Sequence, residues 1–193
     1  MTKRAYPSAR ARILDAAERV ILRKGIGRLS VEAVAAEAEV SKGGFFYHFK
    51  SKDDLLAALV TRLAETVAAG MAATAEADPE PHGRLLRGYV RYAFGAGEDP
   101  ARRERLRALV LALIAASADS PGVVASAKEA NAEAFAAAAA DGVPIAQVLL
   151  VHLALDGLWL GEGLGTLELP ADWRGALADL LVELTRRDIS NDC

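Results

Sequence analysis

Apolar side chains recur at intervals of three and four residues along nearly the whole 193-residue chain, and apolar residues rarely alternate with polar ones. Intervals of three and four predict amphipathic helices, whereas alternation predicts strands. The pattern therefore predicts an all-α fold. The first helix is expected from about Ser8 to Lys24, with Gly25 at its end. Its apolar face consists of Ile13, Leu14, Ala17, Val20 and Ile21.

Three serines mark the starts of the next helices. Ser30, Ser41 and Ser51 each stand where a hydroxyl can cap a helix by accepting a hydrogen bond from its first turn. These caps predict short helices over about 30–38 and 41–49, and a longer helix that begins at Ser51.

Turn-forming residues divide the remaining chain into longer helices. Proline and glycine end or break a helix, and together with acidic or serine neighbours they interrupt the pattern at 78–81, 95–100, 120–122, 141–142 and 165–170. The chain is thus expected to form about nine helices. We expect residues 1–52 to form one domain and residues 53–193 a second, larger one.

Segment 30–49 has the plan of a helix-turn-helix motif. Two or three residues separate its two short helices. In such a motif the second helix enters the major groove of DNA with its N-terminal residues against the bases. Short helical hairpins are also common in all-α proteins, so the spacing alone leaves a purely structural interpretation open.

The second short helix has an inward and an outward face. Phe45 and Phe49 are four residues apart, and they are expected to bury against the first helix together with Val34, Val40 and Leu55. Exposed rings beside a lysine favour a surface that a partner covers. The outward face is expected to hold Lys42, Gly43, Phe46, Tyr47 and His48.

Two features of this segment favour phosphate as the partner group. Gly43 and Gly44 leave the first turn bare, so that a phosphate could reach its backbone N–H groups and the positive end of the helix dipole. Lys52 stands at the first position of the following helix, where the dipole disfavours a cation. A neighbouring phosphate would reverse that preference.

Charge is distributed unevenly along the chain. Residues 1–52 hold eleven Lys and Arg against five Asp and Glu, a balance of +6, whereas the rest carries −9 within a net charge of −3. A basic N-terminal part could meet a polyanion while the acidic part keeps the protein in solution. Charge blocks can equally be solvated faces, so this asymmetry supports nucleic-acid binding without establishing it.

The composition and the lack of a signal-peptide pattern are those expected of a folded cytoplasmic protein. The 52% hydrophobic fraction supports a real core, and the single cysteine, Cys193, excludes an internal disulfide. The N-terminal residues lack the apolar stretch of a signal peptide. Segment 143–161 is long enough to span a membrane, but Gln147, His152 and Asp156 favour a buried helix instead. We therefore expect no membrane partner.

The block from Arg10 to Leu56 resembles the DNA-binding domain of the TetR family of transcriptional regulators. It contains ILDAAERVILRKGIGRLSVEAVAAEAEVSKGGFFYHFKSKDDLL, in which IL.AA, G....S, VSKG, YHF and SK..LL fall at the family's spacing. The later stretch ALDGLWLGEGLG is similar to the eighth helix of one subgroup. The resemblance implies a homodimer, a palindromic operator on double-stranded DNA, a C-terminal ligand-binding and dimerisation domain, and a small-molecule effector of unknown identity.

The resemblance also implies roles for individual residues. Lys42 matches a base-contacting position, and Tyr47 and His48 match positions that face the groove and touch bases or phosphates. The positions that match phosphate contacts are Ser30, Ser41 and Lys52.

The chain departs from the family pattern at three positions. Gly44 stands where a threonine is frequent and Phe46 where a phosphate-binding tyrosine is frequent, so two hydroxyl contacts are missing. Glu39 replaces the usual glycine of the turn. If Glu39 keeps a left-handed backbone, the strain costs about 1 kcal/mol.

Candidate ligand-binding residues come from two helices. A stripe on the eighth helix, Leu149, His152, Asp156, Trp159 and Gly163, could face a ligand or a second subunit, although His152 and Asp156 could simply satisfy each other in a core. A second candidate lining comes from the fifth helix, whose aromatic residues are more often core. The residues that we expect to line a pocket are Arg87, Tyr89, Tyr92, His152, Asp156 and Trp159.

The last two helices also carry features of a dimer seam. Gly157, Gly161 and Gly165 repeat every fourth residue and permit close helix approach. The ninth helix supplies an apolar stripe that would complete a four-helix interface between two subunits. That stripe consists of Trp173, Leu177, Leu180, Leu181 and Leu184.

Two alternatives compete with a DNA-binding regulator. An enzyme is disfavoured because the chain has no CxxC, HExxH, GxSxG or Walker-type loop, and its three histidines, His48, His82 and His152, lack metal-site spacing. We accordingly expect no cofactor and no metal. A helical interaction protein with weakened or lost DNA binding is the second alternative. The resemblance implies a transcriptional regulator, and we expect a repressor that a small molecule releases from DNA.

Overall fold

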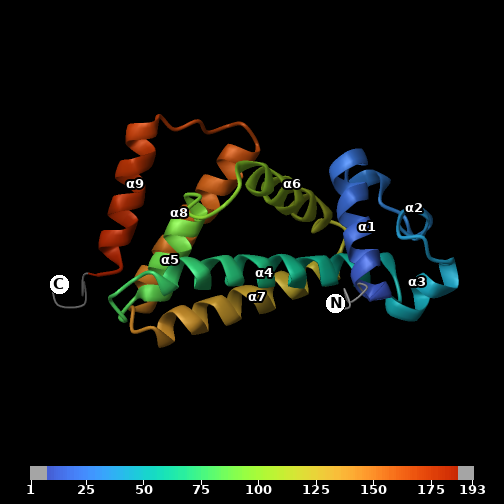
Figure 1. Cartoon of the computed structure of the whole chain (residues 1–193), viewed down its shortest axis with the longest axis horizontal. Helices are drawn as coiled ribbons and strands as arrows, with labels where there is room; N and C mark the ends of the chain where they lie inside the picture. Colours follow the sequence, from blue (N-terminus) through green and yellow to red (C-terminus); the bar gives the residue numbers. More distant parts are fainter. Residues whose placement is uncertain (1–7, 187–193) are drawn as a thin grey trace, which may run out of the picture. The chain divides into compact units, whose positions relative to one another are not determined.

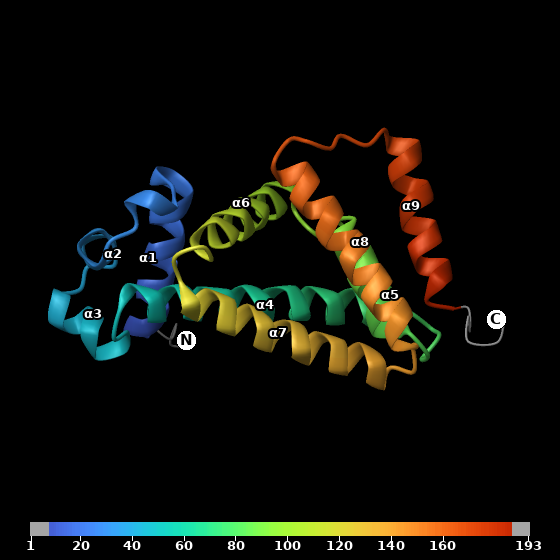
Figure 2. The same cartoon turned by 180° about the vertical axis from the view of Figure 1, so that it is seen from behind.

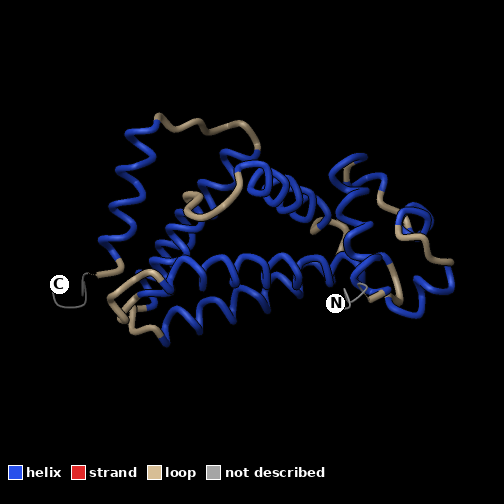
Figure 3. The backbone as a smooth tube through the Cα atoms, in the orientation of Figure 1, coloured by secondary structure: helices blue, strands red, loops and turns tan. Residues whose placement is uncertain are grey.

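The computed structural model describes residues 8–186, and these form nine α-helices, one 3-10 helix (Ile26–Arg28) and no strand (Figure 1). Figure 3 shows that only short loops join most of the helices. The all-α prediction and the number of helices are confirmed for the described residues. The α-helices are α1 Ala9–Lys24, α2 Val31–Glu37, α3 Lys42–His48, α4 Lys52–Glu76, α5 Arg84–Ala93, α6 Pro100–Ala116, α7 Pro121–Ala140, α8 Ile145–Gly163 and α9 Ala171–Leu184.

Serine caps begin the N-terminal helices as predicted. Ser30 Oγ accepts a hydrogen bond from Ala33 N at 3.1 Å, and Ser41 Oγ accepts one from Gly44 N at 3.0 Å. At the start of α4, Ser51 Oγ accepts from Asp54 N at 3.0 Å, while the Asp54 carboxylate accepts from the backbone N–H of Lys50. Each cap satisfies an N–H group that has no partner inside its helix.

The described chain divides into two compact units. The first consists of residues up to 63 together with 108–128, and the second of residues 64–107 together with 129 onward. Helices α4, α6 and α7 each contribute to both units. The predicted boundary between residues 52 and 53 describes a division of function, and it stays a prediction.

In the first unit α1, α2 and α3 enclose a single core (Figure 1). Fully buried apolar residues of α1, among them Ile13 and Val20, pack in one cluster with Val34 of α2 and Phe45 of α3. Leu109, Leu113 and Val123 from the later segment join the same cluster. Burial of one large apolar side chain contributes about 1.5–3 kcal/mol, so this core fixes the orientation of α3.

In the second unit α5 packs against both α8 and α9, and Figure 2 shows α5 alongside α8 from the reverse side. A close helix approach occurs at Gly88, where an added Cβ would lie 2.5 Å from the carbonyl oxygen of Met71 in α4. Thr74 of α4 donates a hydrogen bond to the Gly88 carbonyl at 2.7 Å. Only glycine permits this contact.

Arg87 is the most heavily bonded side chain of the second unit. It is fully buried, and its guanidinium donates to both oxygens of Asp78, to the carbonyls of Glu80 and His82, and to the hydroxyl of Thr185. These hydrogen bonds use all five N–H donors of an arginine. Arg87 therefore fastens the loop before α5 and the end of α9 to α5.

Helix α8 is buried on one face only, which differs from the predicted buried helix. Val148, Val151, Leu155 and Leu158 are buried, but a second apolar row along the helix is exposed. By length and composition alone, α4 and α8 could each cross a membrane, a test that core helices of soluble proteins also pass. The exposed row consists of Ile145, Leu149, Leu150, Leu153, Leu160 and Leu164.

Candidate nucleic-acid interface and ligand site

The segment between α2 and α3 makes the predicted tight turn. Ala38–Ser41 joins the two helices, and Glu39 adopts a left-handed backbone with φ of 55°. The left-handed conformation costs about 1–2 kcal/mol for a residue that has a side chain, whereas glycine adopts it without strain. Glu39 thus keeps the left-handed backbone of the glycine that is usual in the family at this position, and it carries the corresponding strain.

The buried and exposed faces of α3 are those that the residue spacing predicted. Phe45 and Phe49 are 0% and 1% exposed, whereas Phe46 is 44% and Tyr47 85% exposed. The Phe45 ring makes edge-on contact with Phe46 and a tilted contact with Phe49. The outward rings thus stand on a rigid base.

Lys42 and Tyr47 project from the exposed face of α3, and the half-buried His48 packs its ring edge-on against Tyr47 with 5.0 Å between ring centres. Gly43 is exposed as well, and an added Cβ there would approach only the Ser41 hydroxyl, at 3.8 Å. Lys52 is exposed in the first turn of α4. The structure therefore brings a bare helix turn, exposed rings and basic groups together on the first unit.

One expectation about the glycines is wrong. The N–H of Gly44 donates to the Ser41 hydroxyl, so it is not available to a phosphate. Ser30 and Ser41 both use an oxygen lone pair as a cap. Because a hydroxyl also carries one hydrogen, each serine can still donate to a phosphate oxygen while it caps its helix.

Acidic residues already contact part of the basic surface. Nζ of Lys42 lies 2.7 Å from Oε1 of Glu32, and both side chains are well exposed. The hydrogen bond from Lys42 is the main cause that lowers the pKa of Glu32 below its ordinary value. On the other face of α2, Arg19 and Arg23 both pair with Glu37. The sequence pattern did not reveal Glu32 as a partner of Lys42.

Next to Lys52, Asp53 connects the start of α4 to the start of α7 within the first unit. Its carboxylate accepts hydrogen bonds from the Ser120 hydroxyl and from the N–H of Gly122 at 3.2 Å. An acidic side chain at a helix N-terminus is favoured by the dipole. Asp53 thus positions the helix turn that presents Lys52.

The structure brings some of the predicted pocket residues together in the second unit. The His152 ring of α8 lies 5.4 Å from the Tyr89 ring of α5 and 4.7 Å from the Phe135 ring of α7, between centres. Nε2 of His152 is 3.6 Å from Asp156. Burial raises the pKa of Tyr89, and the charge of Asp156 acts in the same direction. Phe135 is an additional member that the sequence pattern did not identify.

The remaining predicted pocket residues lie in different surroundings. Arg87 has no donor left for a ligand, so we leave it out of the proposed site. Tyr92 is buried with its ring against Gly70 of α4. Trp159 is half-buried and packs against the core cluster of the second unit. Among the described residues no group of acidic, histidine or cysteine side chains could hold a metal ion.

Comparisons with known proteins match both parts of the chain. Residues 13–59 match the family described as bacterial regulatory proteins of the tetR family, and residues 83–186, more than half of the chain, match the Tetracyclin repressor-like C-terminal domain. The HTH-type transcriptional regulator TtgR of Pseudomonas putida is 37% identical over 65 residues, which cover 34% of this chain and 31% of TtgR.

Solved structures match over nearly the full length. The multidrug binding protein EbrR, complexed with ethidium, is 30% identical with a TM-score of 0.68, covering 92% of this chain and 98% of that chain. A transcriptional regulator from Rhodococcus sp. Rha1 has a TM-score of 0.73 at 22% identity, covering 93% and 96%, and supports the fold alone. Members of this family are transcriptional regulators and not enzymes. The chain belongs to the TetR family of bacterial regulatory proteins, and its first helices form that family's helix-turn-helix domain.

Proposed function

We propose that the protein is a homodimeric transcriptional repressor that binds a palindromic operator through α3 and leaves it when a small-molecule effector binds. The observation that carries the proposal is the exposed face of α3, on which Tyr47, 85% exposed, stands beside Lys42 on a fully buried aromatic base. Such a protein acts in the cytoplasm, where bacterial DNA lies.

The contact scheme follows from the position of each group. Lys42, in the first turn of α3, would donate to base edges in the major groove, and Tyr47 and His48 would contact bases or phosphates beside it. Ser30, Ser41 and Lys52 would hold the DNA backbone. Phosphate contacts set the register of the motif, and the base contacts supply specificity.

The exposed apolar rows of α8 and α9 support the dimer. On α8 the row includes Leu153, which is 67% exposed, and Gly157, where an added Cβ would meet nothing within 4 Å. On α9, Trp173 and Leu180 are 65% and 56% exposed. Contiguous apolar surface of this kind marks an interface, and two copies of both helices would bury it in a four-helix arrangement. Related by a two-fold axis, two α3 helices would read half-sites about 34–36 Å apart.

The effector would bind in the second unit among α5, α7 and α8. Tyr89, Phe135 and His152 supply rings, and Asp156 lies one turn beyond His152 on α8. The solved EbrR complexes contain imidazole, ethidium and malachite green. Binding would favour one arrangement of the dimer only if the ligand has different affinities for the two arrangements.

A helical interaction protein with reduced DNA binding is the second candidate. Phe46 and Gly44 lack the hydroxyls that the family frequently presents to the DNA backbone, and Glu32 already neutralises Lys42. These features predict weak phosphate contacts. Lys42, Tyr47 and Lys52 are nevertheless exposed and favour the regulator.

Selection of bound sequences from a random pool of double-stranded DNA tests the proposal. We expect enrichment of a palindrome, and affinity for it that falls steeply with salt through counterion release. Lys42→Ala should lower specific binding more than nonspecific binding. Lys128→Ala, which removes the same charge from an exposed position of α7, is the control. No enrichment together with a flat salt response would favour the interaction protein.

A further inference from the structure

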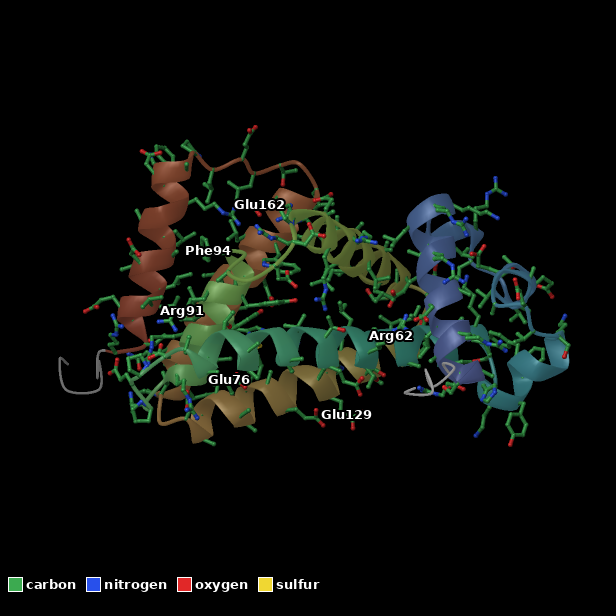
Figure 4. The ribbon with its side chains drawn as sticks, viewed as in Figure 1. Arg62, Glu76, Arg91, Phe94, Glu129 and Glu162 are labelled. Atoms are coloured by element: carbon green, nitrogen blue, oxygen red, sulfur yellow. The ribbon has the colours of Figure 1, made fainter. Side chains whose placement is uncertain are left out.

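Two arginines, Arg107 and Arg174, pair with one glutamate in the second unit, where the segment after α5, the start of α6, the end of α8 and the start of α9 meet. A third, Arg103, precedes Arg107 by about one turn of α6. Nη2 of Arg107 lies 2.7 Å from one carboxylate oxygen of Glu162, and Arg174 contacts the other oxygen. Nη2 of Arg103 donates to the carbonyl of Gly95 at 3.4 Å. Glu162 and Phe94, which both border the cluster, are labelled in Figure 4.

Two of these arginines hold buried donors without acceptors. Nε of Arg103 and Nε of Arg107 are both enclosed by protein and have no hydrogen-bond partner among the described residues. Arg103 also forms no ion pair there. A buried unpaired polar group costs about 1–3 kcal/mol, and more when it is charged. Two such unpaired N–H donors are expected where a bound ligand supplies the missing hydrogen-bond acceptor.

The charges of the cluster favour an anion as that acceptor. Burial lowers the pKa of Arg174, and repulsion from Arg103 and Arg107 lowers it further. The carboxylates that pair with these arginines are Glu162, which is mostly buried, and Glu104, which is exposed. The charges of Arg107 and Arg174 are thus offset by carboxylates, whereas Arg103 forms no ion pair among the described residues.

The surroundings also supply an apolar wall. The guanidinium of Arg174 lies over the Phe94 ring, 5.1 Å from its centre. Arg103 packs on Gly95 so closely that an added Cβ would overlap the guanidinium. Trp159 precedes Glu162 by about one turn of α8. Planar guanidinium groups match carboxylate and phosphate oxygens in pairs.

We propose that Arg103 and Arg107 bind the oxyanionic group, a carboxylate or phosphate, of a small apolar effector. The proposal rests on the proposed effector function, adds the first turns of α6 to the effector site, and specifies the chemistry of the ligand. It predicts that the site prefers an anionic ligand to a cationic one such as ethidium, because the charge of Arg103 is not offset by an ion pair among the described residues and would repel a cation.

Binding of four matched probes to the DNA-free protein tests the proposal: 1-naphthoate, 1-naphthyl phosphate, neutral 1-naphthamide and cationic 1-naphthamidine. Calorimetry measures the affinities. At least one of the two anions should bind roughly tenfold or more tightly than the amide, as hydrogen bonds to charged groups allow. The stronger anion identifies which oxyanion fits. Arg103→Gln removes a guanidinium group that would bind the anion, so it should remove this preference. The fold should be kept, because Arg103 forms no ion pair among the described residues that the change would break.

Arg105→Gln is the matched control, because Arg105 is exposed on the same helix and bonds only to its own turn. It should leave the preference unchanged. Equal binding of anion and amide, preference for the amidine, or no binding by any probe would overturn the proposal. The ligand titrations contain no DNA, so their outcome does not depend on DNA binding. Failure of the operator selection would refute DNA binding without contradicting the anion site.

Discussion

Lys42 and Glu32 form an ion pair across the helix-turn-helix, with Nζ of Lys42 2.7 Å from Oε1 of Glu32. The lysine proposed to read bases is therefore neutralised in the protein without DNA. Exposed ion pairs contribute only about 0–1 kcal/mol, so a base or phosphate can displace Glu32. Glu32 then acts as a competitor of DNA for the same ammonium group.

Glu32→Gln should strengthen DNA binding. The change frees Lys42 and removes a negative charge from the proposed DNA surface, so affinity for the selected operator should rise roughly two- to fivefold at low salt. Fluorescence anisotropy of labelled DNA measures the effect. Glu133→Gln on α7, an exposed glutamate outside the motif, is the control. Weaker binding by Glu32→Gln would mean that the ion pair orients Lys42 productively.

Phe46→Tyr should also strengthen DNA binding. Phe46 is 44% exposed on α3, so an added hydroxyl could reach solvent or a phosphate without disturbing the core. A hydrogen bond to a charged phosphate would raise affinity roughly three- to tenfold. Tyr47→Phe, which removes a hydroxyl from the adjacent exposed position, should lower it. Anisotropy titrations that show no change for either variant would remove both rings from the contact scheme.

Leu153→Glu should convert the proposed dimer into a monomer. Leu153 is 67% exposed at the middle of the apolar row of α8, and a carboxylate buried there would lack a partner. Sedimentation at micromolar concentration measures the mass, and circular dichroism checks that helicity is kept. Ile114→Glu, at a 50% exposed apolar position of α6, should not change the mass. A wild-type protein that sediments as a monomer would refute the dimer.

Asp78→Asn should lower the free energy of unfolding at neutral pH, and the loss should be smaller at acidic pH. The substitution removes the close carboxylate partner of the buried Arg87 and leaves the more distant Glu80 carboxylate, 3.7 Å away; removing one partner of a buried pair costs about 3–5 kcal/mol. Hydrogen bonding from Arg87 is the main cause that holds the pKa of Asp78 well below its ordinary value. Because the folded-state pKa is depressed, this stabilisation is present above about pH 4 and is lost as pH falls further.

Urea denaturation at pH 7 and pH 3 checks this dependence. The difference in unfolding free energy between wild type and Asp78→Asn should shrink as pH falls. Asp179→Asn, at an exposed position of α9, should change stability little at either pH. A difference that stays constant with pH would show that Asp78 is not stabilised as a carboxylate.

Local signals in the sequence were sufficient for much of the first unit. A serine cap acts within three residues, and Phe45 and Phe49 share a face because a helix repeats every 3.6 residues. The left-handed residue at Glu39 could be anticipated only from the family resemblance, in which a glycine usually stands at this position of the turn. The caps and the shared face depend on neighbours along the chain, which the sequence displays directly.

The candidate ligand site was less predictable. Arg87 shares its helix with Tyr89 and Tyr92, yet its partners include Thr185, 98 positions away. Arg107 meets Glu162, and Glu162 in turn meets Arg174, although both are distant from Arg107 in sequence. Pairings of this kind depend on how helices pack, and periodicity carries no information about them.

The sequence by itself determined the helices, the inward and outward faces of α3, and membership of the TetR family, because each follows from local spacing. Only the tertiary structure decided that Glu32 pairs with Lys42 and that Arg87 forms its ion pair with Asp78. It also decided that the Nε groups of Arg103 and Arg107 have no hydrogen-bond partner among the described residues. The reason is physical: a charged side chain acquires its role from whichever group the packed helices bring within hydrogen-bonding distance.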